Sequence, residues 1–236
     1  MELSNAEIAL CREVDFDTEV ALALKRITGN AVERAYGRSE NDWELQPIDA
    51  LSSLNTTGSL SELQATIPSD YRAYWGIRRE ENGLESGREL VVLKDQDPMA
   101  FVRLRRPDGI NYDVTPEDVL VRLQQWHSLY QIEILGADHD QVELSFGILP
   151  ENLMSFAEEV YWFCTDVTEA DGDEYDEDDP DFARALELPD VSREFAEKYI
   201  AQMKEFFGDY QETEWMGIKL LAANMEKSRN LFLWWD

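Results

Sequence analysis

The sequence has few of the residues that crosslink a fold, bind metals or attack substrates. It contains two cysteines and two histidines in 236 residues. Cys11 and Cys164 lie far apart in apolar helical surroundings and form none of the short spacings used for zinc sites or dithiol chemistry. We therefore expect two buried free thiols, as in proteins of a reducing compartment.

Long apolar runs are also missing. No stretch approaches the roughly 18 apolar residues that a membrane-spanning helix requires. The opening Met-Glu-Leu-Ser-Asn-Ala-Glu lacks the basic and apolar segments of a secretory signal. These two absences predict a cytoplasmic protein.

Positive charge is scarce. Only 21 Lys and Arg stand against 50 Asp and Glu, which gives a formal net charge of −29. Such a field repels phosphate backbones and anionic lipid surfaces, so we expect neither nucleic acid nor membrane as a partner. The same field speeds the capture of a basic protein. Solubility alone explains the charge equally well, and the two interpretations stay open.

Catalytic motifs are absent as well. The sequence contains no GxSxG elbow, P-loop, GxGxxG turn or HExxH pair. His127 ends an amphipathic helix and His139 lies in an Ala-Asp-His-Asp turn, so we expect structural or surface roles for both. With fifty acids, no carboxylate pair is singled out for hydrolytic chemistry. A calcium loop fails because Gly172 at its sixth position places Val167 at its first. We predict no catalytic residue, cofactor or metal site, with weak divalent binding by the acids left as an alternative.

What the sequence has is enough apolar material for a core, at 44% hydrophobic residues. Residues 1–66 are interpreted as an N-terminal helical region and 67–236 as an α+β domain. The domain is predicted to have an antiparallel or mixed central sheet, with strands near residues 89, 101, 131, 141 and 231 and covering helices near 116, 150 and 214. The strand at Phe101–Arg105 rests on alternation of side-chain type.

The most readable signals lie between residues 112 and 164. Thr115-Pro116-Glu117-Asp118 combines a helix N-cap, proline in the first turn and acids near the positive helix end. Two alternating segments follow and predict a hairpin. The terminal run Leu231–Trp235 is apolar at every position, which predicts a strand inserted in the sheet and buried on both faces.

Between Asp166 and Asp181, ten of sixteen residues are acidic and none is basic. This run is predicted to be a loop or disordered, because it has little apolar surface to bury. It either lies along a basic groove of a partner or serves as a solvated tether. Together with two tryptophans in less periodic contexts, it supplies the predicted partner-binding residues: Asp171, Asp173, Glu174, Tyr175, Asp176, Glu177, Asp178, Asp179, Asp181, Trp75 and Trp215.

Several short pieces carry a family resemblance through their order and spacing: Ile67–Ala73, Asn111–Thr115, Leu123–Trp126, Ile134–Ala137, Phe156–Tyr161 and Leu231–Asp236. Through them the segment from about Pro68 to the C-terminus resembles a bacterial family catalogued as domain of unknown function 4253. This sequence departs from the family pattern by an acidic insertion at about 168–213. The resemblance implies no activity or cofactor. Such proteins look similar to small α+β immunity proteins found beside bacterial toxins, which is an analogy only.

The leading hypothesis is an acidic cytoplasmic immunity protein that occludes the active site of a basic bacterial toxin, in particular one acting on nucleic acid. Two alternatives remain. One is an enzyme that uses carboxylates, with or without a divalent metal. The other is a general protein-interaction module. The sequence does not indicate an oligomeric state.

Overall fold

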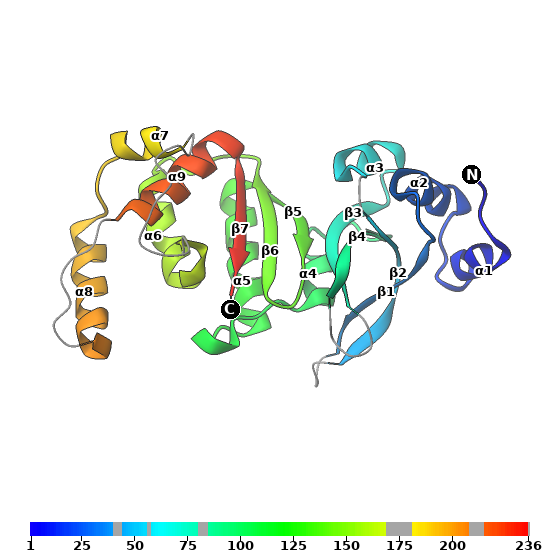
Figure 1. The fold of residues 1–236 in the computed structure, drawn as a ribbon, viewed down its shortest axis with the longest axis horizontal. Coiled ribbons are helices and arrows are strands. Elements are labelled where there is room, and N and C mark those ends of the chain that lie inside the picture. Colours follow the sequence, from blue (N-terminus) through cyan, green and yellow to red (C-terminus); the bar gives the residue numbers. More distant parts are fainter. Residues whose placement is uncertain (40–43, 56–57, 80–84, 169–180, 208–214, 236) are drawn as a thin grey trace.

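One mixed β-sheet runs through the protein (Figure 1). The computed structural model describes residues 1–39, 44–55, 58–79, 85–168, 181–207 and 215–235. Among these residues, the strand order is β1-β2-β4-β3-β5-β6-β7. Every neighbouring pair is antiparallel except β3 and β5, which run parallel. The predicted α+β class with a mixed sheet is therefore confirmed.

The strands come in three groups along the chain. Two hairpins form one half of the sheet. A third hairpin forms most of the other half, and the last strand of the chain is added at its edge. Their bounds are β1 Glu33–Arg38, β2 Leu45–Leu54, β3 Arg72–Arg79, β4 Glu85–Leu93, β5 Ile132–Ala137, β6 Gln141–Phe146 and β7 Asn230–Trp234.

Helices gather at both ends of this sheet, with α1–α3 at one end and α6–α9 at the other (Figure 1). The α-helices are α1 Asn5–Glu13, α2 Thr18–Thr28, α3 Leu60–Thr66, α4 Ala100–Arg105, α5 Pro116–Tyr130, α6 Leu153–Phe163, α7 Phe182–Glu187, α8 Arg193–Phe207 and α9 Met216–Ser228. Two short 3-10 helices, η1 Ile110–Tyr112 and η2 Thr165–Thr168, complete the described elements. None of the described helices is long and apolar enough to cross a membrane.

Two hydrophobic cores lie on opposite faces of the sheet. Helices α1–α3 cover one face of β2, β3 and β4, where Leu51, Ala73 and Leu90 are buried. Helices α4, α5, α6 and α9 pack on the other face, against residues such as Val91 and Leu144. Because successive strand residues point to opposite faces, this arrangement covers both sides of β2–β4. Among the residues that the structure describes, helices cover only one side of β5–β7.

The predicted start of α5 is confirmed in detail. Thr115 accepts a hydrogen bond from the amide of Asp118, and the Asp118 carboxylate accepts one from the amide of Thr115. This reciprocal capping satisfies two amides that the helix end would leave without partners. Pro116 occupies the first turn, where a missing N–H costs nothing.

The predicted strand at Phe101–Arg105 is wrong, because these residues form helix α4. Phe101, Val102 and Arg105 are at most 4% exposed, and their spacing places them on one face of a helix. Leading into it, the Asp97 carboxylate accepts a hydrogen bond from the amide of Met99 and fixes the chain reversal. The alternation of side-chain type in this short segment was therefore coincidental.

The N-terminal region is helical only in part. Helices α1 and α2 confirm an N-terminal helical extension, but residues 33–54 form β1 and β2. Strand β2 pairs with β4 along five residues, so the sheet continues across the boundary predicted near residue 66. This tertiary pairing decides the structure of a segment whose local signals are mixed.

Strand β7 lies at the edge of the sheet, beside β6 and farthest from β1 (Figure 1). The predicted terminal strand is confirmed, but its predicted burial on both faces is wrong. Leu231 and Leu233 are at most 2% exposed, whereas Phe232 between them is 49% exposed. The apolar residues of β7 therefore lie in two environments, one inside the core and one outside it.

Candidate functional site

The two halves of the sheet meet at β3 and β5, where a single residue pair joins them. Trp75 pairs with Gly136, and no other register pair is formed between these strands. A Cβ on Gly136 would lie 2.7 Å from the Trp75 carbonyl oxygen, so only glycine permits this approach. Beyond this point β3 loses strand pairing on its β5 side.

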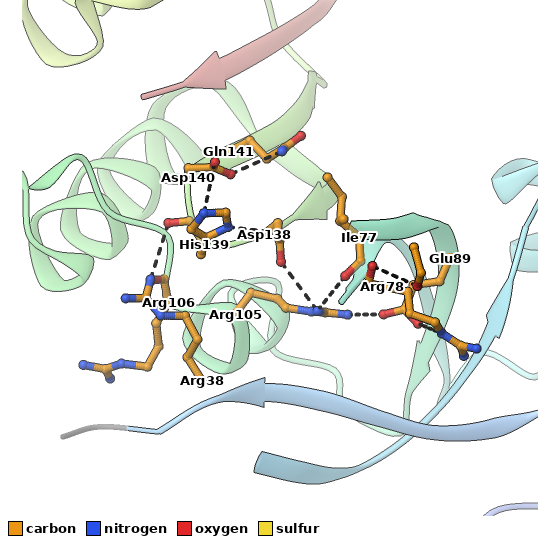
Figure 2. Close-up of polar contacts among 11 residues, drawn as sticks. Arg38, Ile77, Arg78, Glu89, Arg105, Arg106, Asp138, His139, Asp140 and Gln141 are labelled. Atoms are coloured by element: carbon orange, nitrogen blue, oxygen red, sulfur yellow. Dashed lines mark hydrogen bonds and ion pairs between the residues drawn. The ribbon is translucent and has the colours of Figure 1, made fainter. Parts of the chain in front are cut away.

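A buried arginine lies beside the part of β3 that has no strand pairing on its β5 side. Arg105, the last residue of α4, donates through Nη1 to the Ile77 carbonyl at 3.4 Å and through Nη2 to Glu89 at 2.5 Å. Its Nη1 also lies 3.6 Å from Asp138, directly after β5 (Figure 2). The guanidinium thus connects β3, β4 and the end of β5 where backbone pairing stops.

Glu89 is shared by two arginines. Besides Arg105, it pairs with Arg78 at 3.3 Å, and Arg78 also reaches Glu33 at 2.9 Å and the Ser52 hydroxyl at 3.1 Å. A pocket of about 110 Å³ opens beside these groups. We call Arg78, Glu89, Arg105, Asp138, His139 and Asp140 the junction network.

His139 lies between two carboxylates at the edge of this network. Its Nδ1 is 3.1 Å from Asp138 Oδ2, and its Nε2 is 3.1 Å from Asp140 Oδ2 (Figure 2). Asp138 is 4% exposed, while the side chains of His139 and Asp140 are about a third exposed at 30% and 27%. The three side chains offer ligand atoms within 4.8 Å of one another.

Burying so many charges is expensive unless each is paired. The junction network is mostly paired, but Arg105 Nε has no hydrogen-bond partner among the described residues. Groups of this kind occur both in structural ion-pair networks and at functional sites. Because Arg105 replaces strand pairing between the two halves, a structural role accounts for Glu89, Arg78 and Arg105. It does not account for His139 and Asp140, which face solvent.

A second feature is the side of β5–β7 that no described helix covers, together with one adjoining residue each from β3 and β4. We call this surface the open face: Trp75, Arg88, Glu133, Gln141, Glu143, Phe232 and Trp234. Pairing across the strands sets its members together, because Gln141 lies opposite Trp234 and Glu143 lies opposite Phe232. Glu133 is exposed, and Trp234 is partly exposed. The open face is on the same side of the sheet as α1–α3, which cover only the neighbouring strands.

A shallow hollow lies where the open face meets β3 and β4. The Arg88 guanidinium covers the Trp75 ring at 4.6 Å and pairs with Glu143 at 3.2 Å. Phe232 and Gln141 line the far side of the hollow, and Asp138 reaches it from the junction network. The two features are therefore neighbours.

The structure separates the residues predicted to bind a partner. Trp75 lies on the open face. Trp215 packs edge-on against Phe195 and Tyr199 at 5.6 and 5.1 Å, which favours a role in holding α8 and α9 together. Asp181 is 9% exposed and pairs with Lys227 at 2.6 Å. The remaining predicted residues lie outside the described part of the chain: Asp171, Asp173, Glu174, Tyr175, Asp176, Glu177, Asp178 and Asp179.

Sequence reasoning missed most of this site. Phe232 and Trp234 had been assigned to a doubly buried strand, and His139 to a surface turn. The Asp-His-Asp order was visible in the sequence, but nothing local indicated that both carboxylates turn toward the same ring. Arg105 was hidden by the wrong assignment of α4 as a strand.

The comparisons with known proteins agree with the resemblance in the sequence. The family model described as Domain of unknown function (DUF4253) matches residues 89–236, well over half of the chain. The match begins at Glu89 of the junction network and includes the whole of β5–β7. No curated protein and no solved structure matches the chain.

Proposed function

The chain belongs to the DUF4253 family, whose description assigns no activity, and we propose from the site itself that the protein binds a cationic protein through the open face. The observation that carries this proposal is the exposure of the aromatic side chains of β7. Phe232 is 49% exposed between two leucines that are fully buried. Exposed aromatics that lie side by side on a rigid sheet are the residues that anchor protein interfaces.

The charge around these aromatics supports a cationic partner. On the open face, Arg88 is already paired with Glu143, and Glu133 adds an exposed carboxylate. Asp140 and its neighbours lie at the margin of the same surface. Over the whole chain, acids outnumber Lys and Arg by 50 to 21. A negative surface around an aromatic centre attracts a basic protein and repels polyanions.

The finer proposal is an immunity function in the cytoplasm. A toxin that acts on nucleic acid has a cationic cleft, and a strongly acidic protein is complementary to such a cleft. Occlusion of the cleft by the open face would neutralise the toxin without chemistry. The acidic run that includes Asp173 and Asp176 would then add negative charge, which raises the association rate more than the affinity.

Quantitative capture with matched variants tests the proposal. Wild-type protein, the open-face variant F232S/W234S and the control L129S are used as baits in extracts of the native cell. Leu129 lies on α5 and is 63% exposed, so its substitution changes surface apolarity elsewhere. We expect a basic protein that the wild type and L129S retain and that F232S/W234S loses at least tenfold.

The partner is then expressed alone in cells that lack this protein. An immunity function predicts growth arrest, rescue by the wild type and no rescue by F232S/W234S. A partner retained equally by the open-face variant would contradict binding through this face. A partner that does not impair growth would instead identify a general interaction module.

An enzyme that uses carboxylates is the second candidate, favoured by the Asp138, His139 and Asp140 cluster beside the hollow. It predicts turnover of a small molecule that D140N abolishes and F232S/W234S leaves intact. The binding proposal predicts that F232S/W234S loses the captured partner and that D140N retains it. The two functions therefore separate with the same variants.

A further inference from the structure

We propose that His139 and Asp140 bind a divalent transition metal ion of the zinc type, with Asp138 orienting the imidazole. This inference is independent of the proposed partner. Nothing in the family description assigns a metal to the chain. It rests on three properties of the turn between β5 and β6: the spacing of its ligand atoms, the arrangement around the ring, and the fixed backbone.

The spacing of the two ligand atoms suits one ion. His139 Nε2 and Asp140 Oδ2 are 3.1 Å apart. At zinc–ligand distances near 2.1 Å, two ligands lie about 3.0 Å apart at a right angle and about 3.4 Å apart at a tetrahedral angle. The observed separation falls between these limits, so it matches that of two ligands of one ion.

The arrangement around the ring is that of a metal-binding histidine with a carboxylate behind it. Asp138 Oδ2 is 3.1 Å from Nδ1 and is buried beside Arg105. Metal-binding histidines commonly donate their second ring N–H to such a carboxylate, which fixes the tautomer. With the proton on Nδ1, Nε2 is the ring nitrogen left to bind an ion, and it lies 3.1 Å from Asp140 Oδ2.

A cation between Nε2 and Asp140 suits this geometry. A neutral imidazole carries one N–H and cannot donate to both carboxylates. Two acceptors that face each other at 3.1 Å repel unless a proton or a metal ion lies between them. The proton and the metal ion are the two competing occupants, and an experiment separates them.

The backbone of the turn is held in place before any ion binds. The Asp138 amide donates to the Gln141 carbonyl at 2.9 Å. The His139 carbonyl accepts from the Asp108 amide at 2.8 Å, and the Asp140 carbonyl accepts from the Trp235 amide at 2.9 Å. Both ligand side chains are about a third exposed, which leaves room for water to complete the coordination. Preorganised ligands bind with a smaller entropic cost.

The ligand types favour zinc, nickel or copper over magnesium and calcium. Imidazole suits the transition metals, whereas magnesium and calcium take oxygen ligands. This preference also separates the site from diffuse binding by the fifty acids of the chain. Excess Mg²⁺ competes for the diffuse sites and leaves an imidazole site largely free.

The test is a zinc titration of the metal-free protein in excess Mg²⁺, followed by calorimetry and by NMR of the histidine ring nitrogens. The chain has only two histidines, so His127 is an internal control in every spectrum. We expect one equivalent of Zn²⁺ to shift the His139 Nε2 resonance and leave His127 unchanged. H139Q and D140N should weaken binding at least tenfold, D138N about tenfold or more, and H127Q should not.

The NMR spectrum of the wild-type protein tests the proposed metal site even where a variant is unstable. A His139 ring that remains protonated on both nitrogens and does not respond to Zn²⁺ would overturn the proposal, because a proton would then be the only occupant. Binding that H139Q and D140N leave unchanged would also overturn it. In that outcome the zinc is held by the diffuse acids.

Discussion

Glu89 shows how much the sheet junction depends on one side chain. It is 3% exposed and faces both Arg105 and Arg78. Removal of one partner from a buried pair leaves an uncompensated charge, which costs far more than the pair itself stabilises. The two arginines therefore make Glu89 the residue whose charge the junction network can least lose.

We predict that E89Q lowers the free energy of unfolding by about 3–5 kcal/mol, because two guanidinium groups lose their shared carboxylate. The matched control E133Q changes an exposed acid on β5 and should stay within about 0.5 kcal/mol of the wild type. Urea denaturation at neutral pH measures both. Equal effects of the two substitutions would mean that the junction network carries no net structural charge pairing.

Glu7 is a second residue whose charge is expected to stabilise the fold. Burial raises its pKa, but hydrogen bonds from Lys25, the Val32 amide and Ser4 outweigh burial and lower the pKa from 4.5 to about 2. A carboxyl with a depressed pKa stabilises the fold above its unfolded pKa and loses that effect as the pH falls toward the folded value. The relevant window is therefore pH 4.5 down to about 2.

We predict that E7Q is less stable than the wild type by about 3 kcal/mol at neutral pH, and that this difference shrinks as the pH falls through that window. Comparison with E2Q removes the effect of general charge, because Glu2 is exposed in the same segment. Denaturation curves at several pH values check it. A wild-type advantage that is constant down to pH 2.5 would contradict the depressed pKa.

At the scale of elements, β7 is the strand that places apolar side chains both in the core and on the surface. Trp235 follows it, is 2% exposed, and donates its indole N–H to the Phe163 carbonyl at 3.2 Å. Its ring lies so close to Gly109 that a Cβ there would be 2.4 Å away. Trp234 lies on the open face instead. The two adjacent tryptophans thus have different environments.

We predict that W235A lowers the free energy of unfolding by about 3–5 kcal/mol through the cavity it leaves. W234A should cost less than about 1 kcal/mol, because its side chain is outside the core. Thermal and urea denaturation of the two variants make the comparison. A larger loss in W234A would show that the open face is covered in the folded protein.

The elements differ in how far their sequence predicted them. Helix α5 was predictable because Thr115, Pro116 and Asp118 act within one turn. Helix α4 was not, because six residues can satisfy both a strand and a helix pattern, and burial of Phe101 and Arg105 decided between them. Strands β1 and β2 depended on pairing with β4. The open face depended on tertiary packing, since Phe232 of β7 is exposed because no described helix covers that side of β5–β7.

At the scale of the whole molecule, charge and fold are connected. The formal charge of −29 opposes the compact state, and screening by salt weakens that repulsion. Within the junction network, Arg105 contacts Glu89 of β4 in one half of the sheet and Asp138, directly after β5, in the other. The two halves of the sheet are therefore expected to unfold together.

We predict that raising sodium chloride from about 20 mM to about 0.3 M increases the free energy of unfolding, because the Debye length falls well below the spacing of most surface charges. The association rate with a cationic partner should fall over the same range. Urea denaturation measures the first effect and stopped-flow mixing the second. Stability that is independent of salt would mean that the acids are largely compensated within the fold.

Contact at the open face is the central claim, and site-specific photo-crosslinking in the native cell tests it most directly. A crosslinking amino acid replaces Phe232 on the open face or, as the control, Leu129 on α5. We predict a discrete adduct with one basic protein from position 232 and none from position 129. The same adducts from both positions, or none from position 232, would contradict a partner bound on β5–β7.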